Sequence, residues 1–110
     1  MPGTSLLRGR IYGAVFEHTK DVGEKYYLVM SNNRRNAAFP QVLAVRMTTT
    51  RPKGPRPSVV EVDRTGVFTG YAVCDDIVEL YPDEVTRERG ALSPREMERV
   101  EAGLRAALGL

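Results

Sequence analysis

The sequence has 110 residues, with 16 lysines and arginines, 14 aspartates and glutamates, one cysteine and no tryptophan. Its hydrophobic fraction of 42% and charged fraction of 27% are those of an ordinary globular domain and exclude a disordered or fibrous chain. No apolar run approaches the roughly 20 residues that span a bilayer, and the first residues lack the apolar segment of a signal peptide. We therefore expect a single cytoplasmic domain over residues 1–110, without membrane association.

The formal net charge of +2 hides an uneven distribution along the chain. Residues 1–74 carry eleven basic and five acidic side chains, whereas residues 75–110 carry five basic and nine acidic ones. The basic excess is concentrated between residues 34 and 64. Cations that converge in space attract a polyanion, whereas dispersed cations form only a solvated surface. The sequence leaves both interpretations open.

β-branched and aromatic residues predict five strands. The strands cover residues 10–16, 25–31, 42–49, 58–62 and 71–76, the last continuing toward residue 81. In the third strand, large apolar side chains alternate with small, cationic or hydroxyl ones, which predicts one apolar face. Residues 32–41, 50–57 and 63–70 are expected to be connections. The second connection is predicted to be stiff and exposed, because it holds three prolines.

The C-terminal segment predicts an amphipathic helix. Ser93, Pro94 and Glu96 form a capping box with proline at the first helical position. The apolar residues that follow at helical spacing are Met97, Val100, Leu104 and Leu108. This stripe is expected to pack on the sheet, which makes the fold class mainly β with a C-terminal helix.

Motifs for metal and covalent chemistry are absent from the sequence. It has no CxxC, HExxH, glycine-rich phosphate loop or GxSxG, and one histidine with one cysteine cannot build a histidine–cysteine metal site. Asp75 and Asp76 are adjacent in a strand, so their side chains point apart. We interpret them as a strand end and turn, and Cys74 as a buried, reduced thiol. No metal or other cofactor is expected.

Five blocks of the sequence resemble, in the same order, the MazF/PemK toxins of bacterial toxin–antitoxin systems. The blocks are RGRIY at residues 8–12, LVMSNN at 28–33, VLAVRMTT at 42–49, VCDD at 73–76 and GALSPREMERVEAGLRAALGL at 90–110. The resemblance implies an SH3-like antiparallel barrel (MazF/CcdB-like), a homodimer and a cognate antitoxin as partner. It also implies a metal-independent, sequence-specific endoribonuclease that cleaves single-stranded RNA.

In that family an arginine just before the second strand and a threonine ending the third strand form the catalytic pair. Thr48 matches the threonine, whereas Lys25 stands at the arginine position and Tyr26 at that of the proline that usually follows. Lysine keeps the cation but loses the planar fork with which arginine holds phosphate oxygens. Metal-free cleavage uses the 2′-hydroxyl of the RNA as nucleophile, so the protein need only move protons and stabilise the phosphorane. Glu24, His18 or a Lys25 with a lowered pKa could each serve as the general base, and the sequence does not choose among them.

Polar and basic side chains around this pair are expected to hold the RNA backbone. Asparagines after the second strand are expected to make a turn that displays Arg34 and Arg35 beside the catalytic face. The predicted RNA-binding residues are Ser31, Asn32, Arg34, Arg35, Arg46, Thr49, Arg51, Lys53 and Arg56. The candidates for stacking on bases are Phe16, Tyr26, Tyr27 and Phe39. Two of these four aromatic residues are expected in the core.

Two alternatives belong to another functional class. The same barrel resembles the CcdB-type toxins, which poison DNA gyrase and depend on a tryptophan near the C-terminus, a residue that this chain lacks. A catalytically inactive binding module of the same fold is the second alternative, because Lys25 replaces the usual arginine. Incubating the purified protein with a defined RNA in EDTA distinguishes both alternatives from an enzyme.

Overall fold

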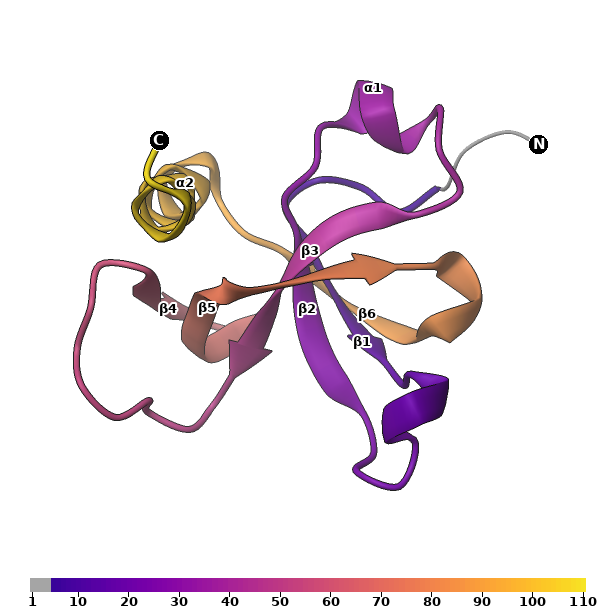
Figure 1. Ribbon diagram of the computed structural model, residues 1–110, viewed down its shortest axis with the longest axis horizontal. Coiled ribbons are helices and arrows are strands. Elements are labelled where there is room, and N and C mark those ends of the chain that lie inside the picture. Colours follow the sequence, from indigo (N-terminus) through magenta and orange to yellow (C-terminus); the bar gives the residue numbers. More distant parts are fainter. Residues whose placement is uncertain (1–4) are drawn as a thin grey trace.

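The computed structural model describes residues 5–110 (Figure 1). Within this range the strands are β1 (Arg10–Ala14), β2 (Lys25–Val29), β3 (Val42–Thr48), β4 (Val59–Arg64), β5 (Phe68–Leu80) and β6 (Val85–Ala91). The helices are α1 (Asn33–Asn36) and α2 (Pro94–Leu108), with short 3-10 helices η1 (Glu17–Thr19) and η2 (Pro82–Glu84). The predicted class, mainly β with a C-terminal helix, is confirmed.

All six strands form one antiparallel sheet in the order β4-β5-β3-β2-β1-β6. The sheet curls until its two edges come close, but among residues 5–110 no backbone ladder joins β4 to β6. Side chains bridge this seam instead. Arg64 Nε donates to the carbonyl oxygen of Ala91 at 2.9 Å, and Arg89 Nη2 donates to that of Val67 at 3.3 Å. The expected barrel is therefore a curled sheet that is open along one seam.

β5 is long because a bulge bends it without ending it. Neighbouring residues of β3 pair with Val73 and Ile77 of β5, so residues 74–76 are extra on that strand. The interpretation of Asp75 and Asp76 as a strand end and turn is therefore wrong. Their side chains do point apart, toward β4 and β3 respectively, because each pairs with an arginine near a different neighbouring strand.

Two other parts of the sheet differ from the sequence predictions. β5 begins at Phe68, although residues 63–70 predict a connection. Gly70 lies within the strand and not in a turn, and its lack of a side chain lets β5 approach β3 closely. A Cβ at this position would lie 2.3 Å from the carbonyl oxygen of Thr48 on β3. The sequence did not predict β6. This strand lies at the edge of the sheet with mostly exposed side chains, and its charged sequence, VTRERGA, therefore lacks the apolar pattern of a buried strand.

Apolar side chains form two cores, one on each face of the central strands. The inner core, covered by α2, includes Ile11, Leu28, Val45, Met47, Val62, Phe68, Cys74, Met97 and Val100. The outer core consists of Leu6, Tyr12, Ala14, Phe16, Tyr27, Val29, Val42, Ala44 and Leu80. We call the sheet face that carries the second set the outer face. Because Met47 points inward, its neighbours Arg46 and Thr48 lie on the outer face.

α2 begins where the sequence predicts. Ser93 Oγ accepts the N–H of Glu96 at 3.2 Å, and the Glu96 carboxylate accepts the N–H of Ser93 at 3.0 Å, which confirms the capping box. The helix has 15 residues, and no helix within residues 5–110 has the length and apolarity needed to cross a membrane.

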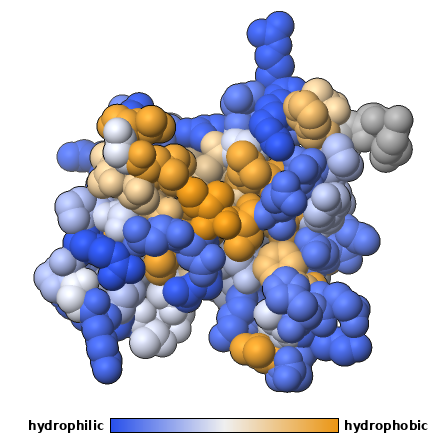
Figure 2. Space-filling view, viewed as in Figure 1, coloured by the Kyte–Doolittle hydropathy of each residue, from blue (hydrophilic) through white to orange (hydrophobic). Residues whose placement is uncertain are grey.

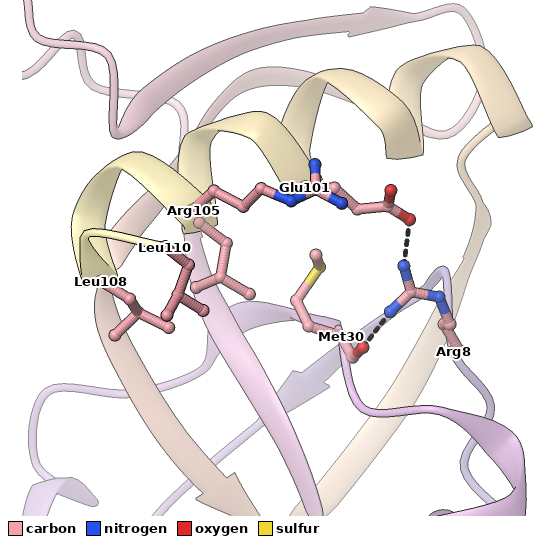
Figure 3. Close-up of a pocket in the computed structure, with 7 residues that line it drawn as sticks. Arg8, Met30, Glu101, Arg105, Leu108 and Leu110 are labelled. Atoms are coloured by element: carbon pink, nitrogen blue, oxygen red, sulfur yellow. Dashed lines mark hydrogen bonds and ion pairs between the residues drawn. The ribbon is translucent and has the colours of Figure 1, made fainter.

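α2 lies close to β4 and β5, and a glycine permits this approach. A Cβ at Gly103 would lie 2.6 Å from a Val60 methyl group and 3.1 Å from the sulfur of Cys74. Cys74 is free and buried, as predicted, and burial raises the pKa of its thiol to about 11. On the other side of the helix, the Arg8 guanidinium contacts the Glu101 carboxylate and a backbone carbonyl at the end of β2, which ties α2 to the sheet (Figure 3).

Candidate functional site

Lys25 and Thr48 lie at neighbouring strand ends on the outer face. Tyr26 pairs with Met47 in the β2–β3 ladder, so the next position brings Lys25 opposite Thr48. Directly opposed residues of an antiparallel pair have Cβ atoms roughly 4.5–5.5 Å apart. Tyr26 and Met47 face the inner core, and therefore both of their neighbours face outward. The structure thus brings together the two residues that the resemblance pairs.

Both side chains have free capacity to bind an anion. Lys25 is exposed, and its ammonium group has no ion pair or hydrogen bond with any other of residues 5–110. Thr48 Oγ1 accepts the N–H of Thr50 at 3.1 Å, which leaves its hydroxyl hydrogen free to donate. Thr49, the residue after Thr48, is exposed. A cation and a hydroxyl donor therefore stand side by side at the same edge of the sheet.

Arg46 extends this group along β3. It pairs with Tyr27 across the ladder, and its Nε donates to Asp76 Oδ2 at 2.7 Å. This single contact orients the guanidinium, while its terminal nitrogens make no further hydrogen bond within residues 5–110. Burial, followed by the Asp76 charge, raises the pKa of the Tyr27 phenol, which therefore stays neutral. The bulge of β5 thus supplies the carboxylate that holds Arg46 in place.

His18 lies in η1, at the rim of the outer face. Its ring stacks on the ring of Phe16 with centroids 5.8 Å apart. The Phe16 ring in turn packs against the Tyr27 ring, with centroids 5.2 Å apart. Phe16 and Tyr27 are core residues, so the expectation that two of the four aromatic candidates are buried is confirmed. The hollow that these three rings border includes neither Lys25 nor Thr48.

Glu24 points to the opposite face from Lys25. Its carboxylate accepts hydrogen bonds from Thr86 Oγ1, from the Tyr26 hydroxyl at 3.0 Å and from Arg87 Nε at 3.1 Å. The hydrogen bond from Thr86 is the main cause that lowers the pKa of Glu24. A carboxylate with three donors and a lowered pKa is a weak base. The structure therefore argues against Glu24 as the general base.

The lowered pKa of Glu24 predicts a pH-dependent contribution to stability. A group whose pKa is lower in the folded state stabilises the fold above its unfolded pKa, and this contribution disappears as the pH falls through the folded value. We expect Glu24→Gln to reduce the free energy of unfolding at pH 7, and the gap to the parent to shrink below about pH 4.3. Urea unfolding at several pH values measures this gap.

Glu17→Gln is the matched control, because Glu17 is exposed and pairs only with Lys20 at the surface. Its gap to the parent is expected to be small at every pH, since exposed ion pairs contribute little. A gap for Glu24→Gln that stays constant from pH 7 to pH 3 would contradict the stabilising role of the carboxylate.

Four predicted RNA-binding residues lie at the far end of β2 from Lys25, namely Ser31, Asn32, Arg34 and Arg35. Ser31 lies six positions after Lys25, roughly 20 Å away in extended conformation. In Figure 1, α1 lies at the top of the molecule, whereas β2 starts at the bottom. The expectation that Arg34 and Arg35 stand beside the catalytic face is therefore wrong.

The polar residues of this segment build the connection itself. Asn32 Oδ1 accepts the N–H of Arg35 at 2.8 Å and so caps α1, which forms in place of the predicted turn. Asn36 is 1% exposed and its amide donates to the carbonyl of Ser31 at 3.0 Å. Arg35 donates to the carbonyl of Gln41 at 2.9 Å. Only Arg34 is left without a side-chain partner among these residues of the described chain.

The loop of residues 50–57 follows directly after Thr48, at the same end of the sheet. Arg51 and Lys53 are exposed and have no side-chain partner within residues 5–110. Arg56 Nε donates to Asp75 at 2.9 Å, and this pair, after a hydrogen bond from Ser58, lowers the pKa of Asp75. In the described part of the chain, no three His, Cys, Asp or Glu side chains gather to hold a metal ion. The cations thus form separate groups at the two ends of β3.

A family model described as the PemK-like, MazF-like toxin of type II toxin–antitoxin systems matches residues 7–108. The chain belongs to this family. Endoribonuclease MazF1 of Mycobacterium bovis is 36% identical over 104 residues, covering 94% of this chain and 93% of the relative. Endoribonuclease MazF4 of Mycobacterium tuberculosis shows the same identity and coverage. The resemblance inferred from the sequence is confirmed.

Solved structures agree with this membership. An endoribonuclease in complex with its cognate antitoxin, from a mycobacterial species, matches with a TM-score of 0.85 and 36% identity, over 96% of this chain and 97% of that one. MazF from Deinococcus radiodurans matches with a TM-score of 0.77 at 19% identity, covering 96% and 97% of the two chains, and shares the fold.

Tyr71 of this MazF-family chain is a candidate that the sequence did not reveal. It pairs with Thr48 on β3 and with Glu61 on β4, and so continues the row formed by Lys25 and Thr48. Its strand was predicted, but the register that sets it beside Thr48 depends on the bulge at residues 74–76, which no local pattern indicates.

Proposed function

We propose that this MazF-type toxin is an endoribonuclease that cleaves single-stranded RNA at a phosphate bound between Lys25 and Thr48. The observation that carries the proposal is the cross-strand placement of an unpaired ammonium group beside a free hydroxyl donor. Relatives with 36% identity are named endoribonucleases, which favours an enzyme over the gyrase-directed or inactive alternatives.

The proposed place of action is the cytoplasm, and cell fractionation tests it.

The proposed chemistry follows from the donors at the site. The 2′-oxygen of the RNA attacks the adjacent phosphorus and the 5′-oxygen leaves, giving a 2′,3′-cyclic phosphate and a 5′-hydroxyl. Lys25 Nζ and Thr48 Oγ1 donate to non-bridging oxygens, whose negative charge increases in the phosphorane. Arg46, oriented by Asp76, adds positive charge on the same face. His18 takes the proton of the 2′-hydroxyl, the Lys25 ammonium gives a proton to the leaving 5′-oxygen, and no step requires a metal.

The loop of residues 50–57 is proposed to hold the RNA backbone. We expect Arg51→Gln to weaken binding of a hexanucleotide RNA and to reduce the slope of log K against log salt by about 0.7, the value for one lost phosphate contact with a single strand. Arg34→Gln is the matched control, because Arg34 is also exposed but lies near the other end of β2. Fluorescence anisotropy at several salt concentrations measures both slopes. Equal slopes for the two variants would contradict the proposal that the loop of residues 50–57 binds the RNA backbone.

An apolar groove beside α2 is the proposed binding surface for a protein partner. It is lined by Met30, Leu43, Ile77, Leu104 and Leu108, and Figure 2 shows an apolar patch beside the helix. Ile77 and Leu108 are 42% and 52% exposed, which is unusual for large apolar side chains at one site. We propose that a second copy covers this groove in a homodimer. A cognate antitoxin is the proposed regulatory partner, since a mycobacterial relative was solved with its own.

Light scattering tests the proposed homodimer. The parent protein is expected at about twice the chain mass of 12.2 kDa at micromolar concentration, and Leu108→Glu at the monomer mass, because a charge in the groove opposes burial. Ala106→Glu adds the same charge at an exposed position of α2 outside the groove and serves as control. A monomeric parent would contradict the proposal.

A further inference from the structure

A hollow of about 170 Å³ lies on the outer face, one strand away from Thr48. Tyr71 and Glu61 form its floor, because they pair directly across β5 and β4. The loop of residues 50–57 forms its wall with Arg51 and Pro52. Tyr71 and Glu61 continue the cross-strand row of Lys25 and Thr48, so the hollow begins one strand spacing, roughly 4.8 Å, from Thr48.

The groups in this hollow have unused binding capacity. Glu61 is exposed, and its carboxylate makes no hydrogen bond or ion pair with another of residues 5–110, although cations border the same hollow. The ring and the hydroxyl of Tyr71 are likewise without a partner in the described chain. Arg56, in contrast, is held by Asp75, and prolines stiffen the loop around it. The hollow thus combines a rigid wall, an aromatic ring, a free carboxylate and a free cation.

We propose that this hollow binds one guanine base of the RNA, next to the phosphate held by Lys25 and Thr48; the proposal rests on the proposed function. An aromatic ring stacks on any base. An ionised carboxylate only accepts hydrogen bonds, and among the bases guanine alone presents two adjacent donors, N1–H and N2–H, on its Watson–Crick edge. Adenine, cytosine and uracil set an acceptor beside each donor, which repels the second carboxylate oxygen. Arg51 contacts the phosphate of the same nucleotide.

A set of uncleavable RNA probes tests this subsite. Each probe is a 2′-O-methyl octauridylate with one guanosine, adenosine or cytidine at a stated position, and fluorescence anisotropy gives its affinity. We expect guanosine at one position to bind roughly 5- to 150-fold more tightly than adenosine there. Glu61→Gln should abolish this preference, whereas Glu98→Gln, on the exposed side of α2, should keep it. Tyr71→Ala should weaken binding roughly 5- to 150-fold, and Tyr71→Phe should retain it.

The probes separate this inference from the proposed activity, because they lack the free 2′-hydroxyl that cleavage requires. A parent protein that cleaves unmodified RNA but shows no guanosine preference at any position overturns the guanine subsite alone. A parent protein that shows the preference without cleaving unmodified RNA supports the subsite and contradicts the endoribonuclease. A Glu61→Gln variant with the parental preference also overturns the subsite. Tyr71→Ala and Tyr71→Phe test the same hollow independently of Glu61, so the test of its place does not depend on one variant folding.

Discussion

Lys25→Ala is expected to abolish cleavage of a defined RNA in EDTA while leaving the fold intact. The ammonium group is the exposed cation opposite Thr48, and a surface lysine without a partner in the described chain contributes little to stability. Lys20→Ala is the control, because Lys20 is an exposed lysine of the neighbouring loop that pairs only with Glu17. Thermal unfolding followed by circular dichroism verifies that both variants fold. Parental cleavage by Lys25→Ala would contradict the proposed site.

Lys25→Arg distinguishes two roles of this residue. If Lys25 acts only as a cation, arginine should preserve or improve the rate, because its planar fork binds two phosphate oxygens. If Lys25 also transfers a proton, arginine, with a pKa above about 12, should lower the rate roughly 10²- to 10⁴-fold. The ends of the products are analysed in the same reactions. A 2′,3′-cyclic phosphate with a 5′-hydroxyl is expected, whereas a 5′-phosphate would require water as nucleophile and contradict the mechanism.

Thr48→Val is expected to lower the single-turnover rate roughly 10²- to 10³-fold, the usual cost of removing one donor to a developing oxyanion. Valine has the same shape as threonine, so the packing at the end of β3 is preserved. It also removes the acceptor of the Thr50 N–H, and Thr48→Ser is therefore the matched control, because serine keeps both the acceptor and the donor. A parental rate in Thr48→Val, with a normal unfolding transition, would exclude the hydroxyl from the chemistry.

Local patterns of the sequence were sufficient to predict several structural elements of this protein. The start of α2 could be predicted because the capping box needs only Ser93, Pro94 and Glu96, which are close in the chain. Four of the six strands, β1 to β4, begin within one residue of their predicted starts, since β-branched and aromatic runs mark a pleated surface. Strand position and family resemblance together were enough to select Lys25 and Thr48.

Other parts of the site depended on contacts between residues far apart in the sequence. Glu24 adjoins Lys25 in the chain, yet the period of two along extended backbone sends it to the opposite face, where Thr86 holds it. Arg34 follows the strand that Lys25 begins, and the length of that strand keeps the two apart.

Cross-strand register was decided only by the tertiary structure. Tyr71 stands beside Thr48 because the bulge at residues 74–76 shifts β5 along β3, and because Gly70 lets the two backbones approach. The sequence by itself therefore determined which segments form strands and where the helix begins, since those signals lie within a few neighbouring residues. Which side chains share a face and a row was determined by pairing between distant segments, where a shift of one residue turns every side chain to the other face.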